Sequence, residues 1–198
     1  MHPDPGRGFK MPDSPSFKLN GGRNLVLIGG RASGKTSVGR ALARILRRPF
    51  VDLDEVLTAE AGCAIADLVA REGWPEFRRR EKALVGRYGR RSGQVLATGG
   101  GVVLDPENVT ILREHGLVVW LKAEAATLAR RLRNDEGGFA SRPSLTGADP
   151  AAEMARVLAE REPLYRAAAH AILDTANLSI PEVIERLLHL VGASPEQQ

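Results

Sequence analysis

Five short apolar runs alternate along the chain with longer stretches of helical periodicity. The runs are nearly continuous in aliphatic residues, which is typical of parallel strands buried on both faces. The expected strands are residues 25–29, 49–53, 94–98, 117–121 and 171–174. The expected helices are residues 36–48, 55–72, 75–91, 106–115, 123–134, 150–169 and 180–192. This alternation predicts a three-layer α/β fold with a mostly parallel sheet, whose ligands gather at the carboxyl ends of the strands.

The limits of this pattern predict one folded domain over residues 24–192. Residues 1–23 contain four prolines, four glycines and few large apolar side chains. We expect a disordered N-terminal tail there, and a short C-terminal tail over residues 193–198.

Composition narrows the class of protein. The 198 residues are 43% hydrophobic and 26% charged, which is ordinary for a soluble globular domain. The net charge of +4 suits anionic ligands, but no nucleic-acid recognition motif accompanies it. The single cysteine, Cys63, excludes an internal disulfide, and no run approaches the roughly 20 apolar residues of a membrane span. Because the N-terminus also lacks a signal-peptide core, we expect a cytoplasmic protein without a membrane or nucleic-acid partner.

Residues 29–36 read Gly-Gly-Arg-Ala-Ser-Gly-Lys-Thr and match the phosphate-loop pattern G-x-x-x-x-G-K-[ST]. An expected strand precedes the motif and an expected helix follows it, which is the setting the motif requires. Backbone amides at the helix N-terminus bind phosphate, Lys35 neutralises phosphate charge, and the Thr36 hydroxyl can bind Mg²⁺. The sequence therefore predicts a site for a nucleoside triphosphate. Its expected residues are Ala32, Ser33, Gly34, Lys35, Thr36 and Ser37.

Asp52 and Asp54 come at the end of the second expected strand, at the same edge of the sheet as the phosphate loop. Two carboxylates beside a triphosphate repel it unless a cation intervenes or one of them takes a proton. We expect Asp52 to face Mg²⁺, directly or through a water, and Asp54 to face the substrate hydroxyl. The alternative is that one of them only caps the following helix.

Two further segments are candidates for ligand contact. Residues 78–80 are consecutive arginines, and because neighbours on a helix point about 100° apart, at most one of them faces the cleft. The residue types do not decide which one it is. Residues 99–101 are three glycines after the third strand, and we expect their backbone to approach a ligand rather than to serve as a linker.

The region before and within the penultimate helix holds two more arginines of interest. Residues 134–147 form a polar, glycine-rich stretch that is either an idle surface loop or a lid that brings Arg142 onto phosphate. Pro163 is expected to kink or restart the helix that contains it, because proline disrupts a helix interior. Such a kink could turn Arg161 towards the site.

Taken together, these motifs resemble the shikimate kinase family from about Asn24 to Leu190. The motifs are GGRASGKTSVGR at 29–40, FVDLD at 50–54, EFRRRE at 76–81, GGG at 99–101, RPSL at 142–145 and REPLY at 161–165. The resemblance implies the reaction ATP + shikimate → ADP + shikimate 3-phosphate. It also implies a five-stranded parallel sheet in the order 2-3-1-4-5, with lid and substrate-binding subdomains, and a monomer.

The resemblance assigns roles that the residues alone leave open. Arg78 and Arg161 are implied to bind the shikimate carboxylate, and Asp54 to orient or deprotonate the 3-hydroxyl. The remaining implied roles are substrate contact for Gly99, Gly100 and Gly101, catalysis for Lys35 and Arg142 together with Asp54, and Mg²⁺ binding for Thr36 and Asp52.

Two positions depart from the common pattern of the family. Ala32 replaces a frequent loop glycine, which is tolerable if its backbone angles are ordinary, and Trp74 stands where a glutamate often follows the glycine. Two other functions fit the same fold: a kinase for another small acid such as gluconate, and a non-catalytic ligand sensor.

Overall fold

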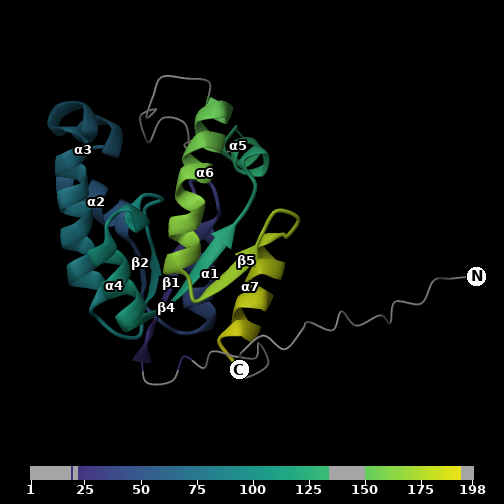
Figure 1. The fold of residues 1–198 in the computed structure, drawn as a ribbon. Coiled ribbons are helices and arrows are strands. Elements are labelled where there is room, and N and C mark those ends of the chain that lie inside the picture. The colour runs from purple at the N-terminus through teal and green to yellow at the C-terminus, as the bar shows by residue number, and fades with distance from the viewer. Residues whose placement is uncertain (1–18, 20–21, 134–149, 193–198) are drawn as a thin grey trace, which may run out of the picture.

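The described part of the chain is built around a sheet of five parallel strands (Figure 1). The computed structural model describes Leu19 and residues 22–133 and 150–192. The strands are β1 (Asn24–Ile28), β2 (Phe50–Asp52), β3 (Val95–Ala97), β4 (Gly116–Lys122) and β5 (Ala171–Asp174). Their spatial order is β2-β3-β1-β4-β5, and every neighbouring pair is parallel. The predicted α/β fold and its 2-3-1-4-5 order are confirmed.

Helices cover both faces of this sheet. They are α1 (Lys35–Ile45), α2 (Leu53–Ala61), α3 (Ile65–Leu84), α4 (Pro106–His115), α5 (Ala125–Arg133), α6 (Pro150–Ala168) and α7 (Ile180–Leu190). A π-helical turn, η2 (Val85–Gly89), continues α3, and a 3₁₀ turn, η3 (Val102–Leu104), follows β3. Among the described residues, no helix is both long and apolar enough to cross a membrane.

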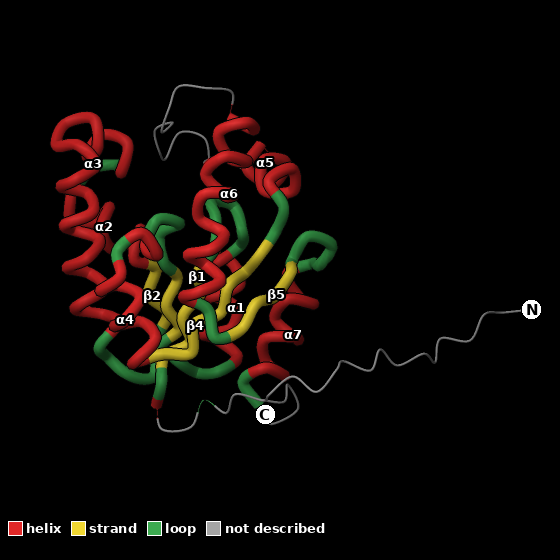
Figure 2. Tube along the Cα trace, viewed as in Figure 1, coloured by secondary structure: helices red, strands yellow, loops and turns green. Residues whose placement is uncertain are grey.

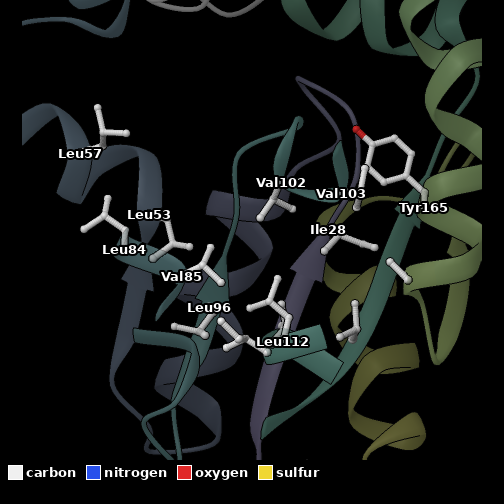
Figure 3. Packing of buried hydrophobic residues seen from close by; sticks show 14 of the residues in the cluster. Ile28, Leu53, Leu57, Leu84, Val85, Leu96, Val102, Val103, Leu112 and Tyr165 are labelled. Atoms are coloured by element: carbon white, nitrogen blue, oxygen red, sulfur yellow. The ribbon is translucent and has the colours of Figure 1, made fainter. Parts of the chain in front are cut away.

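Successive residues of each strand supply two separate hydrophobic cores, because side chains alternate across a sheet. In β1, Leu25 and Leu27 pack with residues of α1 and α7. Val26 and Ile28 belong to the opposite cluster, which takes residues from α2, α3, α4 and α6 (Figure 3). All four side chains are fully buried. The strand is therefore continuously apolar because both of its faces are buried, as we expected.

The carboxyl ends of β1, β2 and β3 meet at one edge of the sheet. β1 leads into the phosphate loop, β2 into α2, and β3 into the glycines at 99–101. Figure 2 shows α2 and α3 on one side of this edge and α5 and α6 on the other. The fold therefore brings the predicted motifs together between two groups of helices.

Several predicted element boundaries are wrong. The helix expected over 55–72 is two helices, since α2 ends at Ala61 and Gly62 takes the left-handed conformation with φ 65°. Gly73, with φ 81° and ψ 168°, interrupts α3 just before Pro75, as the sequence led us to expect. Of the kink or restart expected at Pro163, the restart does not occur, because α6 continues through this residue to Ala168.

The expected tails and lid lie mostly outside the described residues. Of the N-terminal tail only Leu19, Gly22 and Arg23 are described, and the C-terminal tail at 193–198 is not. Arg142 and the rest of the expected lid also fall outside them.

Candidate active site

The phosphate loop folds around the side chain of Lys35. Its ammonium group donates hydrogen bonds to Gly29 O at 3.0 Å, Gly30 O at 2.7 Å and Ser33 Oγ at 3.2 Å. Gly34 begins α1 with φ 91°, a conformation that favours glycine. The loop thus presents the N-terminus of an 11-residue helix and a fixed cation at the same point.

Ala32 has φ 60°, which lies in the left-handed region. The condition under which we expected alanine to be tolerated here, ordinary backbone angles, is therefore not met. A left-handed residue with a Cβ costs about 1–2 kcal/mol, so the loop at Ala32 is strained where a glycine would not be.

Asp52 caps the following helix, which was the alternative that the sequence left open, and it also contacts the phosphate loop. Its Oδ1 accepts the Asp54 and Glu55 backbone N–H groups at 3.0 and 3.4 Å, which caps α2. Its Oδ2 accepts the Thr36 hydroxyl at 2.6 Å, which ties the phosphate loop to the end of β2. Because the Thr36 proton is directed at Asp52, the lone pairs of Thr36 Oγ1 remain available to a cation.

A cavity of about 500 Å³ opens over the phosphate loop. Lys35, Thr36, Asp52 and Asp54 line it, together with residues of α2, the start of α3, and Leu132 of α5. The structure therefore brings Lys35 and Thr36 of the predicted nucleotide site to one space with Asp52 and Asp54.

Of the three consecutive arginines, the structure directs Arg78 to the glycines after β3. A Cβ atom built on Gly101 would lie only 2.5 Å from Arg78 Cζ. Arg79 and Arg80 instead pair with Glu76 on the outer side of α3, at 2.7 and 2.8 Å. The carboxyl of Glu76 has its pKa lowered to about 2 by these two hydrogen bonds.

Arg78 is held from two sides. Its Nη1 donates to Glu81 Oε2 at 2.5 Å, one turn along α3, and its Cζ lies 5.0 Å from the Phe77 ring centre and 5.5 Å from that of Trp74. Trp74 thus packs against the arginine expected to bind substrate. Cation–π contacts of this kind restrict the guanidinium without using its N–H donors.

Glu81 is a buried carboxyl that the sequence analysis did not single out. Burial raises its pKa, and the Arg78 guanidinium opposes that shift only in part. A Cβ on Gly99 would lie 2.7 Å from Glu81 Oε1 and 3.0 Å from Asp54 Oδ1, so this glycine lets two carboxylates approach one loop. The i, i+3 spacing from Arg78 could have indicated an ion pair with Glu81. Pairs with this spacing also occur on solvated helix faces, so the spacing alone does not indicate a buried site.

On the other side of the loop, α6 supplies Arg161 and Tyr165. Arg161 Nη1 donates to Gly100 O at 3.2 Å, so the arginine faces the site without a helix break at Pro163. The Tyr165 hydroxyl donates to the same carbonyl at 2.5 Å, from a side chain with no exposed surface. Tyr165 was not predicted, although it stands four residues after Arg161 and hence on the same helix face.

Comparisons with known proteins found matches that cover most of this chain. The family model for shikimate kinase matches residues 31–191. A shikimate kinase of Oleidesulfovibrio alaskensis is 47% identical over 170 residues, which cover 86% of this chain and 98% of that protein. A shikimate kinase of Syntrophus aciditrophicus is 42% identical over 177 residues, covering 85% and 91% respectively. The solved structure of a shikimate kinase from Acinetobacter baumannii in complex with shikimate matches with a TM-score of 0.81 and 31% identity, covering 91% of this chain and 98% of that one.

Proposed function

Because this chain belongs to the shikimate kinase family, we propose that it transfers the γ-phosphate of ATP to the 3-hydroxyl of shikimate with the residues gathered at this edge of the sheet. One observation carries the assignment of the substrate pocket: Arg78 and Arg161, from different helices, lie at adjacent glycines of one loop. Two guanidinium groups at one point suit a carboxylate, which they can bind through paired N–H donors. An acidic substrate is favoured over a neutral sugar.

The phosphate end of the site is assigned to the loop before α1. Lys35 would neutralise the β- and γ-phosphates, and the amides of Ala32, Ser33 and Gly34 would bind their oxygens. Thr36 and Ser37 complete the proposed nucleotide contacts.

The residues present fit a magnesium ion. Thr36 Oγ1 offers a lone pair, and Asp52, already accepting three hydrogen bonds, would act on the ion through a water. Oxygen donors of this kind are those Mg²⁺ prefers. When bound, the ion would neutralise charge on the β- and γ-phosphates.

Asp54 is the proposed acceptor of the proton of the 3-hydroxyl. It lies in the first turn of α2, lines the cavity with Lys35, and has its Oδ1 next to Gly99. A carboxylate there can orient the hydroxyl for in-line attack and take its proton as the new O–P bond forms. Arg142 stays a prediction as the lid arginine, and the monomeric state and cytoplasmic location also stay predictions.

The test is ADP release from ATP in the presence of shikimate, quinate, gluconate or no acceptor, with and without Mg²⁺. We expect turnover only with shikimate and Mg²⁺, and loss of turnover when EDTA is added. Gluconate-dependent turnover would instead support a kinase for another acid. Tight shikimate binding without any turnover would support the ligand sensor.

A further inference from the structure

The carbonyl of Gly100 is held by two donors from one face of α6. It accepts the Tyr165 hydroxyl at 2.5 Å and Arg161 Nη1 at 3.2 Å. A carbonyl oxygen has two lone pairs, so this pair of bonds uses both. The Gly100 carbonyl is therefore a fixed point of the loop and not an acceptor for a ligand.

Fixing this carbonyl also fixes the next N–H group. The described chain has no cis peptide bond, so the Gly100 C=O and the Gly101 N–H point in opposite directions from one planar unit. Because the C=O points to α6, the Gly101 N–H points away from α6. Gly101 is also the residue whose missing Cβ leaves room for the guanidinium of Arg78.

Tyr165 is the more rigid of the two donors. Its ring stacks on Trp120 of β4, with ring centres 5.5 Å apart and planes 21° apart, and none of its surface is exposed. Figure 3 shows the ring reaching from α6 with its hydroxyl turned towards the loops above the sheet. Arg161, by contrast, is only half-buried and has further N–H donors for a substrate.

We propose that Tyr165 is a positioning residue for substrate recognition: its hydroxyl sets the Gly100–Gly101 peptide so that the Gly101 N–H and Arg78 meet the same carboxylate. The inference rests on the proposed function, since it assumes an acidic substrate between Arg78 and Arg161. It adds that the carboxylate subsite depends on a side chain that does not touch the substrate.

The first experiment compares Tyr165→Phe with wild type on two acceptors, shikimate and its analogue with a hydroxymethyl group in place of the carboxylate. Phenylalanine keeps the ring stack and removes only the donor. We expect the KM for shikimate to rise about tenfold, as for the loss of one buried hydrogen bond, with the KM for ATP within about twofold. The KM for the analogue should be equal in the two proteins.

The chain has only two tyrosines, which supplies a matched control. Tyr88→Phe alters the other tyrosine, which lies in the η2 turn, and should leave both KM values unchanged. An unchanged shikimate KM in Tyr165→Phe would overturn the proposal. So would an equal loss on both acceptors, which would indicate a general structural role.

A second measurement keeps Tyr165 in place. In the Tyr88→Phe background, biosynthetic 3-fluorotyrosine labels Tyr165 alone, and its ¹⁹F resonance reports on the hydroxyl's surroundings. We expect shikimate to shift this resonance and the hydroxymethyl analogue to leave it in place; no shift with shikimate, or equal shifts with both, would overturn the proposal. Failure of the proposed function is a separate result: in that case the wild-type protein itself would show no shikimate-dependent turnover.

Discussion

Gly101→Ala tests whether the position of Arg78 controls substrate recognition. Gly101 has φ −102° and ψ 3°, which lies outside the left-handed region and is allowed for alanine, so the main effect of the change is the added methyl group. The atoms nearest to the added Cβ all belong to the guanidinium of Arg78, with Cζ at 2.5 Å. Ordinary contact begins at 3.4 Å, and both guanidinium nitrogens lie closer to the added Cβ than Cζ does, so Arg78 must move by about 1 Å or more.

A displacement of about 1 Å in a binding group can lower the rate roughly 100-fold. We therefore expect kcat/KM for shikimate to fall about 100-fold, equivalent to about 2.7 kcal/mol of transition-state stabilisation. The KM for ATP should change little, because Arg78 does not line the cavity over the phosphate loop. The melting temperature should also change little, because the methyl group meets the end of a long side chain rather than backbone.

The assay is steady-state ADP release at saturating ATP with varied shikimate, together with thermal unfolding. Gly86→Ala is the matched control, because a Cβ there meets no atom within 4 Å. Near-wild-type kcat/KM in Gly101→Ala would refute the assignment of Arg78. An equal rise in the KM for ATP would show that the change disturbs the whole loop.

Three further predictions follow from single residues. Asp54→Asn should retain ATP binding by calorimetry while losing most ADP release, and wild-type turnover would contradict a role for Asp54 in proton transfer. Ala32→Gly should leave the melting temperature equal or up to about 2 °C higher, because relief of the left-handed strain is partly offset by the greater freedom of glycine in the unfolded chain; a fall of several degrees would contradict strain at this position. His170 Nδ1 accepts the Val118 N–H at 3.0 Å, and burial, with the charges of Arg113 and Arg23, lowers the pKa of His170 below 6.5. The stability that neutral His170 contributes is therefore present above pH 6.5 and lost as the pH falls through the lowered pKa. Between pH 7.5 and 5, the melting temperature of wild type should therefore fall relative to that of His170→Asn. A constant difference over that range would show that the pKa of His170 is the same in the folded and unfolded protein, which would contradict the lowered pKa.

Structural features that depend on residues close together in the sequence could be predicted. The phosphate loop is contiguous, and the angles of Gly34 and the bonds of Lys35 to Gly29 and Gly30 are made within eight residues. Strand and helix patterns gave the fold class for the same reason, since burial on two faces leaves a local periodicity. The local rule for proline left a kink or a restart open at Pro163, and only the structure shows that the helix continues without a restart to the buried Tyr165.

The sequence by itself determined a nucleotide-binding α/β protein with carboxylates and glycines at the strand ends. Without the family resemblance it did not determine which arginine of residues 78–80 faces the site, because that depends on how α3 packs against the loop after β3. Nor did it reveal that Glu81 anchors Arg78, or that Tyr165 holds Gly100 from the opposite helix. Tyr165 and Gly100 are 65 residues apart in the sequence, so their contact exists only once the sheet has brought the loop after β3 next to α6.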